Sequence, residues 1–262
     1  MRRAGGLPLL PLSRLVARPE PRAPGPSAAP SRLAPLPTGD EKTARVRAMF
    51  DTIAPRYELV NRVMTFGLDR GWRRRTVAAL ALPPDALVLD LACGTGDLSR
   101  LGARCAYRMV GADLSAGMLA ANDRAAPVVQ ADGYRLPFAA GTFDGLLCGY
   151  ALRNFSDLAG TLTEAARVVR PGGRLAVLEV DAPSSRVMRA GYDVWFTRVV
   201  PVLGGLLSDR DAYAYLPRSV DYLPPAAALR RLLLHAGFSG VGIRPLAGGL
   251  SQLLVATRGG EP

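Results

Sequence analysis

The fold of this chain is decided by the stretch Val88-Leu89-Asp90-Leu91-Ala92-Cys93-Gly94-Thr95-Gly96-Asp97-Leu98-Ser99. Its apolar start predicts a buried strand, and its glycines predict a tight turn that leads into a helix. Gly94 and Gly96 let the backbone approach a ligand more closely than a Cβ would permit, and the following helix offers free N–H groups. We therefore predict that Asp90, Gly94 and Gly96 bind a cofactor.

The residues around the turn distinguish two classes of cofactor. The dinucleotide fingerprint G-x-G-x-x-G needs a third glycine, where this chain has Ser99. The anionic pyrophosphate of NAD would gain nothing from Asp90, whereas S-adenosylmethionine carries cationic sulfonium and ammonium groups. A second predicted strand, 108–113, ends in Asp113, whose carboxylate can accept both ribose hydroxyls. The pattern favours S-adenosylmethionine over NAD, and over a glycine turn that binds nothing.

Downstream of this turn, short apolar runs alternate with segments of helical spacing. The expected elements are a helix at 115–124, strands at 127–131 and 143–150, a helix at 157–169, a turn at Pro171-Gly172-Gly173, a strand at 174–180, a helix at 226–235 and strands at 241–245 and 250–257. This alternation predicts a doubly wound, mostly parallel seven-stranded α/β sheet with ligands at the carboxyl ends of its strands. The last two strands are expected to form an antiparallel hairpin.

The chain is expected to contain one domain preceded by an extension. Residues 1–40 hold nine of the 22 prolines and show no helical or strand period, so they are predicted to be disordered. The single domain, 41–262, begins with helices at 43–50, 57–65 and 68–80. Its expected parts are a helical cap at 41–82, a cofactor-binding core at 83–180, an apolar substrate or lid insertion at 181–225, and a C-terminal helix and strands at 226–258.

The net charge of +11 is not by itself a signal for nucleic acid. Of the 33 basic residues only Lys42 is a lysine, which indicates a general preference for arginine. No basic patch is interleaved with the aromatic residues that would stack on bases, so no nucleic-acid partner is expected. The basic character outside the extension favours either an anionic membrane surface or a solvated surface.

The three cysteines and the apolar segments exclude several classes. Cys93, Cys105 and Cys148 lack the spacing of a disulfide framework or of a zinc site, so no metal is expected. No segment reaches the ~18 uninterrupted apolar residues of a membrane span. The chain is therefore expected in the cytoplasm, and peripheral contact with the cytoplasmic membrane is left open.

Several stretches closely resemble the ubiquinone/menaquinone biosynthesis C-methyltransferases over about residues 43–258. They are Met49–Tyr57, Asn61, Leu89–Asp97, Ala151–Asn154, Arg170–Arg174, Asp211–Leu216 and Ala236–Phe238. The glycine motif alone indicates only a methyltransferase, but the opening Phe-Asp-x-Ile-Ala-x-x-Tyr and the triplet Leu152-Arg153-Asn154 are specific to this family. The resemblance implies a class I methyltransferase fold with an N-terminal helical cap. It also implies S-adenosylmethionine-dependent methylation of a ring carbon of a prenylated quinol, most commonly demethylmenaquinol.

The resemblance further implies contacts to the cofactor. They are Ser99 after the glycine turn, Asp113 on the ribose, Asp132 and Gly133 at the adenine, and Gly149 after the fourth strand. Family members often have an Asn-Ala-type pair in place of Asp132-Gly133, and a serine in place of Gly149. At Gly149 the contact is therefore expected from the backbone alone.

Methylation of a ring carbon requires a group that favours the phenolate of the quinol. The only histidine, His235, is predicted near the C-terminal end of a late helix, so a histidine base is not expected. Arg153 is the candidate, because a fixed guanidinium lowers the pKa of a nearby phenol. A structural ion pair is the alternative. Tyr57 and Asp51 could orient the quinol or relay its proton, or belong to a solvated helix face.

The apolar stretch 187–207 has three possible roles. As a helix it could cover the isoprenoid chain, lie on a membrane, or pack as a buried or dimer-forming helix, so a homo-oligomer stays open. Three functions remain: a quinol C-methyltransferase, a methyltransferase for another lipophilic or phenolic metabolite, and a non-catalytic subunit of a quinone-synthesis complex. The intact acids Asp90 and Asp113 argue against the last.

Overall fold

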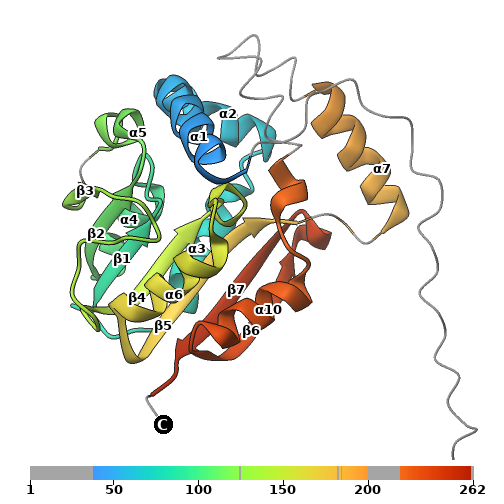
Figure 1. Ribbon diagram of the computed structural model, residues 1–262. Coiled ribbons are helices and arrows are strands. Elements are labelled where there is room, and N and C mark those ends of the chain that lie inside the picture. Colours follow the sequence, from blue (N-terminus) through green and yellow to red (C-terminus); the bar gives the residue numbers. More distant parts are fainter. Residues whose placement is uncertain (1–37, 124, 182, 184, 200–218, 261–262) are drawn as a thin grey trace, which may run out of the picture. The chain divides into compact units, whose positions relative to one another are not determined.

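Strand β1 (Leu87–Leu91) is an interior strand of a seven-stranded sheet in the computed structural model, which describes residues 38–123, 125–181, 183, 185–199 and 219–260. The strand order is β3-β2-β1-β4-β5-β7-β6 (Figure 1). β7 runs antiparallel to both β5 and β6, whereas the other neighbours are parallel. The predicted sheet and its antiparallel final hairpin are confirmed. The other strands are β2 (Arg108–Asp113), β3 (Val128–Gln130), β4 (Phe143–Gly149), β5 (Val169–Val180), β6 (Phe238–Leu246) and β7 (Ser251–Arg258).

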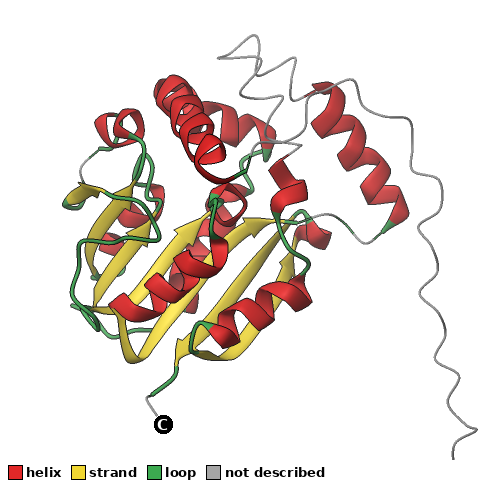
Figure 2. Ribbon diagram, in the orientation of Figure 1, coloured by secondary structure: helices red, strands yellow, loops and turns green. Residues whose placement is uncertain are grey.

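Helices cover both faces of the sheet because successive strand residues point to opposite sides. In β4, Leu146 packs into the core beneath α6 (Leu158–Val168) and α10 (Ala226–His235). Its neighbour Leu147 packs into a second core beneath α3 (Asp69–Ala79) and α4 (Asp97–Arg104). Figure 2 shows this helix–sheet–helix layering. The near-continuous apolar runs of the strands follow from burial on both sides.

Two predicted boundaries in this core are wrong. The helix expected at 115–124 is only α5 (Ala116–Ala120), because the buried Asn122 turns toward the glycine turn and donates from Nδ2 to the Gly94 carbonyl (2.8 Å). The turn expected at 171–173 lies inside β5, which begins at Val169 opposite Phe143. A register shift there accommodates a proline that cannot donate to the ladder.

The predicted helical cap is present before the sheet. It consists of α1 (Gly39–Ile53), a 3₁₀ turn (Ala54–Arg56), α2 (Tyr57–Met64) and α3. Ile53, Val60 and Met64 form a small apolar core of their own. Because α1 begins at Gly39, order starts slightly inside the stretch 1–40 that was predicted to be disordered, and residues 1–37 of that prediction lie outside the described residues.

The apolar stretch 187–207 is described as far as residue 199. Residues 186–194 form α7 (Arg186–Val194), which continues as a π-helical turn (Trp195–Val199), and the rest of the stretch lies outside the described residues. The Trp195 indole donates to the Met64 carbonyl (3.1 Å), so the stretch contacts the cap. Among the described helices, none is long and apolar enough to cross a membrane.

Candidate active site

The carboxyl ends of β1, β2 and β4 open onto a cavity, hereafter the cofactor cavity, which the glycine turn borders. The cavity is lined by predicted cofactor residues from three strand ends and from the loop after β3, namely Asp90, Gly94, Asp113, Asp132, Gly133 and Gly149. α1 contributes Val46, Arg47 and Phe50 from the cap. The structure thus brings together residues that the sequence separates by about a hundred positions, as a doubly wound sheet requires.

Two predicted cofactor residues, Gly96 and Ser99, support this cavity without lining it. The buried Ser99 hydroxyl donates to Asp90 Oδ2 (2.7 Å) and so fixes the orientation of that carboxylate. Gly96 has a φ of 91°, and a Cβ there would lie 3.0 Å from Asn122 Nδ2. Its contribution is therefore the conformation of the turn.

The residues that line the cofactor cavity and that sequence reasoning missed include Arg73, Thr95, Tyr150 and Asn154. Thr95 could have been found from its place between the two glycines of the turn. Asn154 could have been found from the Leu-Arg-Asn triplet. Arg73 carries no local signal, because α3 brings it to the cavity from the cap side.

The two acids of the cavity are held by different groups. Asp113 accepts hydrogen bonds from the Gly94 N–H at Oδ2 and from the Ser115 N–H at Oδ1, both at 2.8 Å. Burial raises the pKa of Asp113, and these N–H donors act in the opposite direction. Each oxygen keeps a further lone pair, so the carboxylate remains able to accept two ribose hydroxyls.

Asp90 is the more deeply buried acid. Burial raises the pKa of Asp90 to about 7, although the Ser99 hydroxyl and the charge of Arg73 oppose this effect. Its Oδ1 atom has no hydrogen-bond partner among the described residues. A cationic ligand group at this atom would therefore satisfy both its charge and its hydrogen-bonding capacity.

We expect the affinity of the protein for S-adenosylhomocysteine, the demethylated form of the predicted cofactor, to fall as the pH is lowered through about 7. Asp90 is protonated below that pH and then cannot pair with the ligand's ammonium group. In the free protein the raised pKa contributes stability that is present at acid pH and is lost as the pH rises through about 7. Calorimetric titration between mildly acidic and mildly alkaline pH measures the effect. The Asp90→Asn variant should bind weakly with no such pH dependence, and a flat wild-type profile would contradict the prediction.

A second cavity of about 330 Å³, hereafter the apolar cavity, adjoins the first. It is lined largely by apolar and aromatic side chains of the cap and α7, including Met64, Phe66, Leu68, Trp72 and Trp195. Tyr57 and Tyr150 line both cavities. The predicted residue Tyr57 therefore lies at the boundary between a polar site and an apolar one.

Arg153 borders the apolar cavity. It also forms an ion pair with Glu179, which is the structural role that the sequence left open beside a catalytic one. Its guanidinium pairs with Glu179, donates to the Tyr150 carbonyl (2.8 Å) and donates from Nε to Ser219 Oγ (3.1 Å). The side chain of Glu179 is fully buried and that of Arg153 is nearly so. The structure therefore shows a buried salt bridge at the cavity wall, and a role of Arg153 toward a substrate stays a prediction.

Asp51 lies outside the linings of both cavities. Although burial raises the pKa of Asp51, hydrogen bonds from the Ser115 hydroxyl (2.6 Å) and the Gly117 N–H (2.8 Å) lower it below its usual range. A Cβ at Gly117 would lie 2.7 Å from the Asp51 Cα. Asp51 thus anchors α1 to the start of α5.

The only lysine anchors the other end of α1. Lys42 is buried, and its Nζ donates to the Phe155 carbonyl (2.8 Å) and lies 3.8 Å from the centre of the Tyr222 ring. Burial lowers the pKa of Lys42 to about 8. Because Phe155 also lines the cofactor cavity, this contact holds the cap helix over that cavity.

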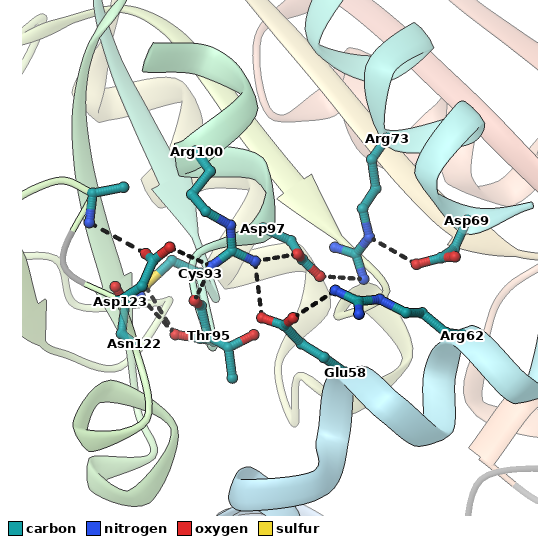
Figure 3. A network of polar contacts seen from close by, with 12 residues as sticks. Glu58, Arg62, Asp69, Arg73, Cys93, Thr95, Asp97, Arg100, Asn122 and Asp123 are labelled. Carbon is teal, nitrogen blue, oxygen red and sulfur yellow. Dashed lines mark hydrogen bonds and ion pairs between the residues drawn. The ribbon is translucent and has the colours of Figure 1, made fainter. Parts of the chain in front are cut away.

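A network of ion pairs joins the cap to the glycine turn (Figure 3). Glu58 on α2 pairs with Arg62 (3.0 Å) and with Arg100 on α4 (2.8 Å). Arg100 also pairs with Asp97, whose other oxygen lies 3.4 Å from Arg73 on α3. Three helices that approach the cavity from different directions are thereby linked.

Within the part of the chain that the structure describes, no three His, Cys, Asp or Glu side chains form a group that could hold a metal ion. The three cysteines are free thiols, and Cys93 and Cys148 are buried.

The chain is similar to known proteins over most of its length. Residues 38–258 match the ubiE/COQ5 methyltransferase family. The demethylmenaquinone methyltransferase of Mycolicibacterium paratuberculosis is 43% identical over 225 residues, which cover 84% of this chain and 96% of that protein. The demethylmenaquinone methyltransferase of Corynebacterium kroppenstedtii is 41% identical over 227 residues, which cover 84% of this chain and 97% of that protein.

A solved structure shares the fold at low sequence identity. A SAM-dependent methyltransferase from Thermotoga maritima aligns with a TM-score of 0.57 and 18% identity, covering 81% of this chain and 99% of that one. The predicted class I methyltransferase fold is thereby confirmed. With the family match spanning both cavities and the cap, the chain belongs to the ubiE/COQ5 methyltransferase family.

Proposed function

We propose that this methyltransferase uses S-adenosylmethionine to methylate a ring carbon of a prenylated quinol, and that it converts demethylmenaquinol into menaquinol. The observation that carries the proposal is the apolar cavity, which joins the cofactor cavity at Tyr57 and Tyr150. An aromatic ring that enters between these residues would meet the methyl donor at the boundary. The relatives named demethylmenaquinone methyltransferase, at 41–43% identity, support the choice of ring.

The residues of the cofactor cavity fit S-adenosylmethionine. Asp113 offers acceptors for the ribose hydroxyls, and the unpartnered Oδ1 atom of Asp90 offers one for the ammonium group. Asp132 and Gly133 line the part of the cavity beyond β3, where the adenine is expected. When bound, the cofactor supplies an electrophilic methyl group on a sulfonium.

The reaction needs alignment and a phenolate. An electron pair of the ring carbon would form the new carbon–carbon bond while the electrons of the carbon–sulfur bond stay on sulfur, and release of the ring proton to solvent water would restore aromaticity. We assign Tyr57 to orienting the quinol hydroxyl, because it lines both cavities. We assign Arg153 to stabilising the phenolate from the cavity wall, because its guanidinium is fixed by Glu179. Apolar walls around the ring exclude water, and this strengthens both interactions.

Transfer of a labelled methyl group tests this function. The purified protein is supplied with labelled S-adenosylmethionine and reduced demethylmenaquinone in detergent, with a demethylated benzoquinol in parallel. We expect label in the naphthoquinol, and a lower rate for Tyr57→Phe with little change in cofactor affinity. Label in the benzoquinol alone would change the ring assignment. Label in neither, while the cofactor still binds, would reject the function.

We infer that the chain reaches its substrate by docking on an anionic bilayer. Exposed apolar side chains lie on two segments that contribute to the lining of the apolar cavity, namely Phe66 (70% exposed) and Leu68 (45%) before α3, and Val187 (83%) and Val194 (51%) on α7. Exposed arginines lie on the same segments at Arg62, Arg70, Arg186, Arg189 and Arg198. Apolar side chains that insert and arginines that meet anionic headgroups are the two components of interfacial binding.

Flotation with vesicles measures this docking. We expect binding to phosphatidylglycerol-containing vesicles and much less binding to pure phosphatidylcholine. Replacing Phe66 and Val187 by serine should weaken binding by about 100-fold, because two apolar side chains would no longer leave water. Leu234→Ser is the matched control, since Leu234 is 49% exposed on α10, away from the apolar cavity. Equal loss in the control and the double variant would show that this surface does not dock.

A further inference from the structure

Three buried side-chain polar atoms lack a hydrogen-bond partner in the described part of the chain: Arg73 Nε, Asp90 Oδ1 and Asn154 Oδ1. All three residues line the cofactor cavity. Leaving a buried polar atom unpaired costs about 1–3 kcal/mol, so native proteins rarely do it without a reason. Their concentration in one cavity points to the polar atoms of a ligand.

Arg73 is a buried cation that its neighbours only partly satisfy. The residue is 7% exposed. Its Nε lies 3.5 Å from Asp69 Oδ2, and its Nη2 lies 3.4 Å from Asp97 Oδ2 (Figure 3). Charge-assisted hydrogen bonds between guanidinium and carboxylate groups are normally about 2.7–2.9 Å long. Arg73 therefore has donor capacity left for an anion in the cavity.

The surroundings of Arg73 leave room for that anion. Its Nη1 lies 3.8 Å from the point where a Cβ on Gly149 would stand, at the carboxyl end of β4. The same point lies 3.0 Å from Leu98 Cδ1, so a side chain at position 149 would crowd this end of the cavity, which Arg73, Leu98 and Gly149 all line. The charge of Arg73 also acts on Asp90, so the two groups lie within electrostatic range of each other.

We propose that Arg73 binds the α-carboxylate of the methionine end of S-adenosylmethionine while Asp90 binds its α-ammonium group. This proposal rests on the proposed use of that cofactor. An amino-acid zwitterion presents one anionic and one cationic group a few bonds apart, and the cavity presents a buried guanidinium and a buried carboxylate, each with an atom that makes no hydrogen bond within the described residues.

Other anions and other cations fit this place less well. A quinolate would lie in the apolar cavity, whose lining includes Asp69 and Arg153 but not Arg73. Arg47 also lines the cofactor cavity, but its side chain is 48% exposed and faces Asp51 at 3.9 Å. The N-terminus of α4 begins with Asp97, whose negative charge opposes a second carboxylate there.

A pair of ligands that differ only in the carboxylate tests the proposal by calorimetry, without turnover. They are S-adenosylhomocysteine and its decarboxylated form, S-adenosyl-3-thiopropylamine. The wild-type protein should bind the first at least about tenfold more tightly. Arg73→Met should lower this ratio to about twofold or less. Arg73→Lys keeps the positive charge but replaces the planar guanidinium by a single ammonium group, so it should give an intermediate ratio. Arg74→Met, an exposed arginine on the same helix, should keep the wild-type ratio.

The ratio separates the possible failures. General damage to the fold weakens both ligands alike, so the lysine variant and thermal unfolding show whether Arg73→Met still folds. If Arg73→Met keeps the wild-type ratio, or if the wild-type protein does not distinguish the two ligands, Arg73 does not bind the carboxylate, although the proposed cofactor stands. If neither ligand binds the wild-type protein, the proposed cofactor itself is wrong, and the proposal falls with it.

Discussion

The variant Arg153→Met is expected to lose about 3–5 kcal/mol of its free energy of unfolding, because it leaves a buried carboxylate without its partner. Glu179 is fully buried in β5, and the guanidinium of Arg153 is its partner across the end of β4. The same guanidinium also satisfies the Tyr150 carbonyl and the Ser219 hydroxyl. Urea unfolding followed by circular dichroism measures the loss.

A double variant separates the stability of the ion pair from its role in the reaction. Arg153→Met combined with Glu179→Leu removes both charges, and replacing a buried pair by apolar residues is often neutral for stability. We expect the double variant to recover most of the stability and to remain slow in methyl transfer, because no guanidinium then borders the apolar cavity. Wild-type turnover by the double variant would reduce Arg153 to a structural residue. A loss below about 1 kcal/mol in the single variant would instead contradict the buried pairing.

The parts of the fold that could be predicted are those with local signals. The run 88–99 predicts a strand, a glycine turn and a helix because apolar content and φ restrictions act within a few residues, and β1 and α4 follow that order. α10 was predicted at its observed bounds, since its ends are marked by Pro225 and by Ala236-Gly237. The order of strands in space follows from topology rules for alternating strands and helices.

The parts that could not be predicted depend on partners far away in the sequence. Asp51 meets Ser115, and Arg153 meets Glu179, only after the sheet has formed, and no spacing rule pairs such positions. Ser99 shows the same limit at close range. The resemblance implied that Ser99 contacts the cofactor. In the structure its hydroxyl donates to Asp90, which lines the cofactor cavity, and Ser99 itself does not line that cavity. A motif thus locates the site more reliably than it assigns the atoms that face the ligand.

The apolar cavity could be predicted only in part, because its lining is drawn from several segments that lie far apart in the sequence. The stretch 187–207 could cover an isoprenoid chain by its apolar composition, and Trp195 of that stretch lines the cavity. Tyr57 and Met64 come from the cap, Trp195 from the stretch after β5, and Leu250 from the turn before β7. Only their convergence beside the glycine turn gives a methyltransferase a place for an apolar ring, and this convergence is what supports a quinol over a polar acceptor.

Asp113→Ala is expected to weaken S-adenosylhomocysteine binding by about 1.5–3 kcal/mol, or about 10- to 150-fold, because two charge-assisted hydrogen bonds to the ribose are lost. The same carboxylate accepts from the Gly94 and Ser115 N–H groups, so the alanine variant also loosens the glycine turn. Asp113→Asn keeps the shape and one acceptor oxygen, and is expected to lose less.

A ligand without one ribose hydroxyl isolates the direct contact from the loosened turn. If Asp113 binds the ribose, 2′-deoxy-S-adenosylhomocysteine should lose affinity for the wild-type protein and lose little more for Asp113→Ala, since the two changes remove the same hydrogen bond. If Asp113 only shapes the turn, the two losses should add. If the affinity lost through the missing hydroxyl and the affinity lost through Asp113→Ala simply add, another residue accepts the ribose hydroxyl. Asp113 would then only hold Gly94 in place, as Ser99 holds Asp90.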